Sequence, residues 1–227
     1  PPLALSATRC GAHWGALNMR NDVKFDGWTL TARGGERDRF LESVFFTGSG
    51  RMGSRGVTAL RTEPRPLDCG LFVAGIFDRI NEGSPITDFA ALPTPVWAEI
   101  DLGGRRAAIC SEVTRTLDLR TGELRIEYAV TDGARVMERR LFSLTDPGYV
   151  FQRFEISSDA PVTLTLGVDE SPRNCPIPDD QVKENSEVVQ MFRTLESGPA
   201  RRAYSTRFTS LRLDYELSFG PAPEGFT

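Results

Sequence analysis

The amino-acid sequence predicts an all-β protein: a large antiparallel β-sandwich of two sheets, with at most short helices. Two observations carry this prediction. Apolar and polar residues alternate along many segments, and residue pairs typical of tight turns separate these segments at short, regular spacing. Such a succession favours an antiparallel sandwich or barrel. The 227 residues, of which 40% are hydrophobic and 26% charged, can bury a substantial core.

The chain is expected to hold one structural domain. Residues 1–18 are rich in Ala, Gly and Pro without periodicity and predict a poorly defined segment. Residues 19–227 are expected to form a single β-sandwich domain. One short helix is predicted at Arg37–Phe45, because its apolar residues recur at helical spacing: Phe40, Leu41, Val44 and Phe45.

The strands and turns follow from residue alternation and turn chemistry. Glu123–Thr131 places Leu, Ile, Tyr and Val on one face and charged residues on the other, and Val162–Val168 and Leu211–Leu217 repeat this pattern. Gly103-Gly104 and Asp132-Gly133 lie between such segments and tolerate the positive φ that two-residue hairpin turns need. Consecutive strands are therefore expected to pair as hairpins.

Composition excludes several classes of function. The net charge of −4 gives no global case for binding nucleic acid or an anionic membrane. No apolar run approaches the roughly 20 residues of a membrane span, and the first residues do not resemble a signal peptide. We expect a cytoplasmic protein. His13 is the only histidine and the four cysteines form no C-x-x-C pair, so no metal, no cofactor and no histidine-dependent nucleophile is expected.

Two further patterns in the sequence bear on possible chemistry. Gly48–Gly53 matches G-x-G-x-x-G by letter, but no strand–helix–strand unit surrounds it. We interpret it as a sharply bent loop that packs closely or contacts a partner or ligand. Carboxylates are plentiful, and a glycosidase needs two of them across the scissile bond. Most lie in alternating segments and are expected to face solvent, among them Glu42 and Asp78.

Five segments, in order, resemble glycoside hydrolase family 65. Glu42–Gly56 resembles its E-S-x-F pattern followed by G-N-G-Y-x-G-x-R-G, and Gly70–Asp78 resembles its G-x-x-x-A-G-x-x-D strand. Ala91–Thr94 resembles its L-P-N turn. Arg115–Leu124 and Arg140–Asp146 resemble its L-D-x-x-x-G-x-L hairpin and the next strand. The likeness runs from about residue 28 to residue 174. Ser49, Arg51 and Thr94 depart from the family pattern, which indicates a divergent member.

The resemblance implies a fold and a function. The family's N-terminal domain is a β-supersandwich of the galactose mutarotase-like kind. An α/α barrel that follows it carries the general acid and the phosphate site. Family members include maltose, trehalose and kojibiose phosphorylases and some hydrolases, which invert at the anomeric carbon. This chain is then expected to be an accessory domain of a homodimeric enzyme, without catalytic residues of its own. Its partners would be the barrel and a disaccharide or phosphate at a shared rim.

Three residues are candidates for that rim or for the domain interface. Arg51 and Arg55 could donate hydrogen bonds to hydroxyl or phosphate oxygens, and Asp78 is the third candidate. A structural role is the favoured interpretation for Arg55, as a salt bridge, and for Asp78. Two other functions remain open: a free-standing carbohydrate-binding module, which an exposed aromatic strip would support, and an interaction domain without sugar contact, which an exposed apolar patch would support.

Overall fold

Strands make up most of the structure, a computed structural model that describes residues 23–60, 70–83, 85, 87–174, 189–218 and 220. The predicted segment 1–18 lies outside these residues. The described part contains one α-helix, α1 (Arg39–Val44), and one 3-10 turn, η3 (Thr131–Gly133). Its strands are β1 (Lys24–Asp26), β2 (Thr29–Gly34), β3 (Thr47–Gly48), β4 (Met52–Ser54), β5 (Leu71–Val73), β6 (Phe77–Arg79), β7 (Thr87–Phe89), β8 (Ala98–Leu102), β9 (Arg105–Arg106), β10 (Val113–Asp118), β11 (Leu124–Ala129), β12 (Arg135–Phe142), β13 (Val150–Ser157), β14 (Val162–Leu166), β15 (Phe192–Ser197), β16 (Arg201–Thr206) and β17 (Arg212–Glu216).

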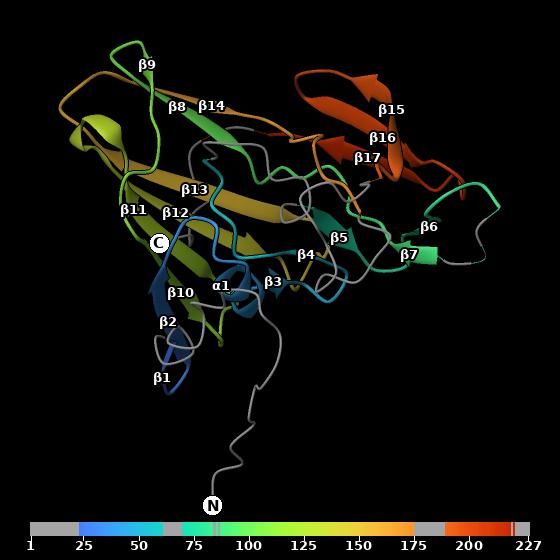
Figure 1. Cartoon of the computed structure of the whole chain (residues 1–227), viewed down its shortest axis with the longest axis horizontal. Coiled ribbons are helices and arrows are strands. Elements are labelled where there is room, and N and C mark those ends of the chain that lie inside the picture. The colour runs from blue at the N-terminus through green and yellow to red at the C-terminus, as the bar shows by residue number, and fades with distance from the viewer. Residues whose placement is uncertain are drawn as a thin grey trace, which may run out of the picture.

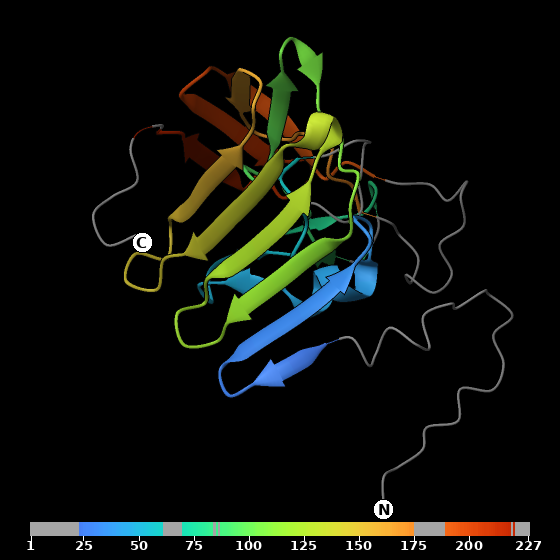
Figure 2. The ribbon, with the colours of Figure 1, turned by 90° about the vertical axis from the view of Figure 1, so that its left-hand side faces the viewer.

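Six strands form one antiparallel sheet in the order β1-β2-β10-β11-β12-β13. Figure 2 shows these strands side by side. β11 pairs with β12 along its whole length, from Leu124 opposite Arg140 to Ala129 opposite Arg135. Every second residue of β11, beginning with Leu124, is buried and the others are half-buried. The predicted alternation therefore sets which face of the sheet meets the core.

The layer that faces this sheet is divided into smaller antiparallel sheets (Figure 1): β14-β8-β9, β15-β16-β17, β3-β4-β5 and β6-β7. The main core lies between the six-stranded sheet and β8, where Ile100 and Leu102 pack in one cluster with Leu124. A second core cluster contains Phe142 of β12 and Met191. Each large side chain that is fully buried contributes about 1.5–3 kcal/mol. The predicted all-β sandwich is confirmed.

The positive φ predicted at the two hairpin turns is confirmed. Gly103 and Gly104 join β8 to β9 with φ of 57° and 84°. Asp132 and Gly133, in the turn between β11 and β12, have φ of 62° and 82°. Gly103-Gly104 is a two-residue turn between Leu102 and Arg105, and positive φ at both of its positions matches the right-handed twist of the flanking strands. The loop at Asp132-Gly133 also includes Thr131 and therefore has three residues. These turns set the register of the long strands.

The predicted short helix is confirmed as α1. The Asp38 carboxylate accepts a hydrogen bond from the backbone N–H of Leu41 at 3.0 Å, which is how an N-cap satisfies a free donor of the first turn. The helix buries Leu41 in the main core. None of the helices in the described residues is long and apolar enough to span a membrane.

Candidate functional site

The glycine-rich segment forms the β3–β4 hairpin. Gly50 in its turn has φ of 78°. A Cβ atom on Gly48 would lie 2.7 Å from the carbonyl oxygen of Met52, and one on Gly53 would lie 2.6 Å from the ring of Phe46. The glycines therefore allow a bent, closely packed backbone, as the sequence predicted. The segment leads into a strand and not into a nucleotide-binding helix.

Arg51 lies at the tip of this hairpin with an exposed side chain. Its carbonyl oxygen accepts the backbone N–H of Ala74 at 2.7 Å. The Ser49 hydroxyl donates to the carbonyl oxygen of Pro147 at 3.2 Å and accepts the N–H of Met52 at 3.3 Å. The hairpin is thus fastened to β5 and to the β12–β13 loop, while the Arg51 guanidinium remains in solvent.

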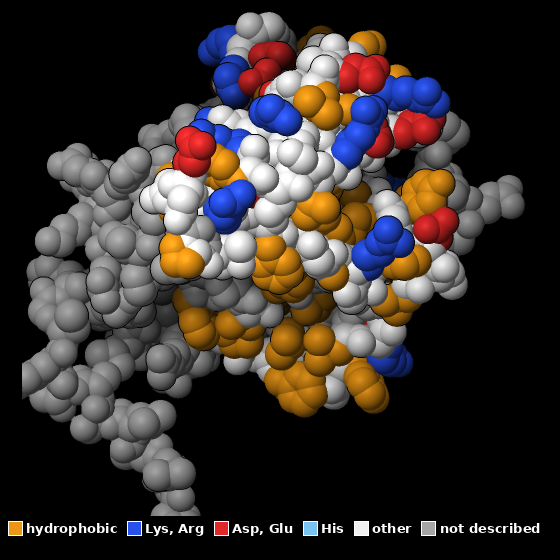
Figure 3. Space-filling model, turned by 90° about the vertical axis from the view of Figure 1, so that its right-hand side faces the viewer, with side chains coloured by type: hydrophobic (Ala, Val, Ile, Leu, Met, Phe, Trp, Pro, Cys, Tyr) orange, Lys and Arg blue, Asp and Glu red, His pale blue; other side chains and the backbone are white. Residues whose placement is uncertain are grey.

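Four phenylalanines form a continuous row beside the hairpin, here called the aromatic row. The ring centroids are 6.4 Å apart for Phe46–Phe72, 5.7 Å for Phe72–Phe89 and 5.0 Å for Phe77–Phe89. The two ends, Phe46 and Phe77, are 44% and 42% exposed. Hydrophobic side chains also gather on the lower part of the face that Figure 3 shows. The chain thus presents exposed aromatic surface next to Arg51.

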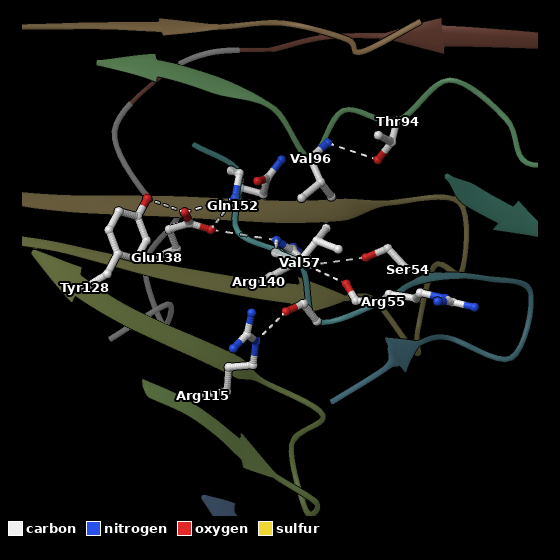
Figure 4. A network of polar contacts seen from close by, with 12 residues as sticks. Ser54, Arg55, Val57, Thr94, Val96, Arg115, Tyr128, Glu138, Arg140 and Gln152 are labelled. Carbon is white, nitrogen blue, oxygen red and sulfur yellow. Dashed lines mark hydrogen bonds and ion pairs between the residues drawn. The ribbon is translucent and has the colours of Figure 1, made fainter. Parts of the chain in front are cut away.

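The chain that follows β4 crosses the inner face of the six-stranded sheet, where buried arginines bind its backbone (Figure 4). Arg140 of β12 donates to the carbonyl oxygens of Arg55 at 3.1 Å and Val57 at 2.8 Å. Arg115 of β10 donates to the carbonyl oxygen of Gly56 at 2.8 Å. Both residues are 1% exposed or less. Guanidinium groups therefore satisfy carbonyls that would otherwise be desolvated without partners.

Glu138 is the acidic member of this buried network. Its two carboxylate oxygens accept the N–H of Ala59 at 3.0 and 2.9 Å, and the Tyr128 hydroxyl donates to it. The Arg140 guanidinium lies 3.7 Å away. Burial raises the pKa of Glu138, and Arg140 opposes that change. Burial, with the charge of Glu138, also raises the pKa of Tyr128. The Glu138 carboxylate therefore accepts its hydrogen bonds from groups of the protein itself.

The other two candidate residues lie in different surroundings. Arg55 is half-buried, and its side chain is directed away from the buried network in Figure 4. Asp78 of β6 is fully buried beneath the turn between β16 and β17. Its carboxylate accepts the backbone N–H groups of Arg207 at 2.7 Å, Phe208 at 3.1 Å and Thr209 at 2.9 Å. Arg55 therefore lies directly after the β3–β4 hairpin. Asp78 lies elsewhere, beneath the β16–β17 turn, and binds backbone N–H groups.

The expectation that the carboxylates face solvent is wrong for Glu42 and Asp78, which are both fully buried. Glu42 lies in the short helix α1, where strand alternation does not apply, and Asp78 lies in the three-residue strand β6, where alternation predicts little. The sequence interpretation also missed Arg115, Glu138 and Arg140. A signal was present, since all three occupy inward positions of their strands. Arg115 lies between the buried Val113 and Leu117, and Glu138 and Arg140 lie together between the buried Val136 and Phe142.

A wide groove of about 860 Å³ crosses the outer face of the six-stranded sheet and includes three glutamates in its lining. Glu127 and Glu155, whose side chains are 45% and 41% exposed, pair with Arg125 at 3.4 Å and Arg153 at 3.3 Å. Glu112 is exposed. A glycosidase acid needs burial to stay protonated near neutral pH, so this groove lacks a feature of such a site.

Among the described residues, no cluster of three or more His, Cys, Asp or Glu is suited to a metal ion.

Comparison with known proteins gives a family and a fold. Residues 35–216 match the family model for the glycosyl hydrolase family 65 N-terminal domain. A solved structure described as "Putative kojibiose phosphorylase from human microbiome" superposes with a TM-score of 0.61 at 14% identity, over 86% of this chain. The chain spans 31% of the length of that structure. No curated protein matches the sequence. The extent of the family match shows that the chain belongs to glycosyl hydrolase family 65, as its N-terminal domain.

Proposed function

We propose that this chain is the non-catalytic accessory domain of an enzyme that cleaves α-glucosidic disaccharides by phosphorolysis or hydrolysis with inversion. Bond cleavage would take place in an α/α-barrel domain of the same enzyme. Family membership supports this role. So does the use of two of the buried carboxylates, Glu138 and Asp78, which accept backbone N–H groups and are not free to act on a sugar.

The aromatic row is the observation that carries the proposal. Phe46 and Phe77 expose large apolar surfaces, and contiguous apolar surface on a soluble protein marks an interface. The row lies against the hairpin that carries Arg51, because Phe72 is the register partner of Gly53. A barrel docked on the row would therefore bring Arg51 to the edge of the contact, where its guanidinium can donate to sugar or phosphate oxygens.

The geometry of the rings supports an interface over a free-standing sugar-binding module. The interplanar angles in the row are 39°, 46° and 82°. A sugar stacks on a flat ring or on coplanar rings, whereas tilted and edge-on rings are the arrangement of a packed apolar cluster. Calorimetric titration of the chain with maltose should therefore give no binding heat. Saturable binding would favour the module instead.

Two experiments test the accessory role. The chain alone, with maltose, trehalose or kojibiose and with or without phosphate, should release neither glucose nor glucose 1-phosphate. Measurable turnover would place a catalytic site in this chain and end the proposal.

The second experiment uses the full-length enzyme with Phe46→Ser and Phe77→Ser together. Loss of apolar contact should lower turnover and speed proteolytic cleavage between the domains. Phe25→Ser is the matched control, because Phe25 is 64% exposed on β1, away from the row. Equal behaviour of the two variants would remove the aromatic row from the interface.

A further inference from the structure

A small pocket beside the β16–β17 turn combines arginine and aromatic side chains. Its volume is about 300 Å³, and its lining consists of Gln190, Phe192, Arg193, Arg207 and Phe208. The Arg207 guanidinium carbon lies 5.2 Å from the centre of the Phe208 ring. The guanidinium carbon of Arg79, from β6, lies 5.8 Å from the centre of the same ring. Two guanidinium groups thus lie over one aromatic ring, and a third arginine, Arg193, lines the same pocket as Arg207.

The arginines of this group have no carboxylate partner among the described side chains, since the buried Asp78 carboxylate is bound to backbone N–H groups of the same turn. None of Arg79, Arg193 and Arg207 forms a salt bridge with a described residue. Other arginines of the same sheet do, as Arg212 shows with its contact to Asp214 at 2.8 Å. Guanidinium groups that share a pocket without a carboxylate create a local positive potential, which an anion would relieve.

The turn that carries Arg207 is held rigidly. Asp78 binds three successive backbone N–H groups of this turn, beginning with that of Arg207. The Thr209 hydroxyl donates to the carbonyl oxygen of Phe77 at 2.9 Å, and the N–H of Leu211 donates to Thr206 Oγ1 at 2.8 Å. The backbone N–H groups of Arg207, Phe208, Thr209 and Leu211 are therefore occupied, so an anion would be bound by side chains that stand on a preorganised turn.

We propose that this pocket binds a small tetrahedral oxyanion of the phosphate or sulfate class. Arginine forks match the oxygens of such anions, and two or three guanidinium groups balance a dianion. The volume is at the lower end of the range for ligand pockets, which fits a small ion. A net charge of −4 disfavours long polyanions such as nucleic acid. This site is separate from the aromatic row, and the proposal does not depend on the accessory role.

The test uses inorganic phosphate and the 227-residue chain. The unfolding midpoint is followed against phosphate concentration at constant ionic strength, with sodium chloride as the balance, and the dissociation constant comes from the shift. Phosphate should raise the midpoint in a saturable way. Arg193→Ala and Arg207→Ala should each raise the dissociation constant by about tenfold. Arg207→Lys should give an intermediate value, because it keeps the charge and loses the fork.

Matched controls separate this site from general charge effects. Arg201→Ala removes an exposed arginine of the same sheet that pairs with Glu216 at 3.8 Å, and it should leave the dissociation constant unchanged. Sulfate should act like phosphate, and acetate should act more weakly. The proposal is overturned if phosphate acts no more strongly than chloride, if acetate equals phosphate, or if Arg193→Ala and Arg207→Ala bind like the unmodified chain. Arg193 is exposed, so its substitution keeps the test valid even if changes at the turn unfold the chain.

Discussion

Removal of the Arg140 side chain should destabilise the domain strongly. Arg140 is 1% exposed, and its guanidinium donates to the carbonyl oxygens of Arg55 and Val57 and to the Ser54 hydroxyl. It also lies 3.7 Å from the Glu138 carboxylate. Arg140→Ala would therefore leave two buried carbonyls without these donors and one buried carboxylate without its cation.

The magnitude follows from these contacts. A hydrogen bond to a charged group is worth about 1.5–3 kcal/mol, and removing one partner of a buried ion pair costs about 3–5 kcal/mol. These contributions overlap, because the same guanidinium makes all of the contacts. We expect the free energy of unfolding to fall by about 3–5 kcal/mol, the range for a broken buried pair. That is a large part of the total stability of an ordinary domain.

Urea unfolding at pH 7, followed by circular dichroism and tryptophan fluorescence, measures this change. Arg125→Ala is the control. Arg125 lies on the outer face of the same sheet, its side chain is 42% exposed, and it pairs with Glu127 at 3.4 Å. Such a pair contributes about 0–1 kcal/mol. If Arg140→Ala costs no more than Arg125→Ala, the buried network does not hold the chain after β4, and the reasoning fails.

Two further predictions concern the same region. Because burial raises the folded-state pKa of Glu138, its contribution is fully present below the usual glutamate range and is lost as pH rises through the folded-state pKa. The unmodified chain should therefore lose stability relative to Glu138→Gln as pH rises above the usual glutamate range, as urea unfolding at each pH would show, and a difference independent of pH would contradict this. Gly53→Ala should destabilise by about 1–3 kcal/mol, because its Cβ would lie 2.6 Å from the Phe46 ring. Gly35→Ala, whose Cβ would meet no atom closer than 4.0 Å, is the control in thermal unfolding.

The sequence predicted the long strands well because one rule governs them. Every second residue of β10, β11 and β12 is buried, so the local alternation of apolar and polar residues indicates which residues face the core. It predicted the connecting region between α1 and β8 poorly. There the strands have two or three residues, too short for alternation to be read, and close glycine contacts decide the path.

The buried charges were missed for a different reason. At positions such as Glu138 and Arg140, a charged side chain suggests an outward face, whereas Val136 and Phe142 on the same strand show that this face is inward. The partners that make burial possible are backbone groups of Arg55, Val57 and Ala59, which are about 80 residues away in the chain. No local pattern in the sequence records a partner at that distance.

The buried network explains how a short hairpin can have a fixed position at the edge of a large sheet. Residues 55–57 leave β4 without extending it, so their carbonyls need donors from elsewhere. Arg140 and Arg115 supply those donors from two strands of the six-stranded sheet, and Ser49 fastens the other end of the hairpin to the β12–β13 loop. With both ends attached to the same sheet, the hairpin has little freedom to move independently of it. An interface built on this edge would therefore meet a preorganised surface, which lowers the entropy lost on docking.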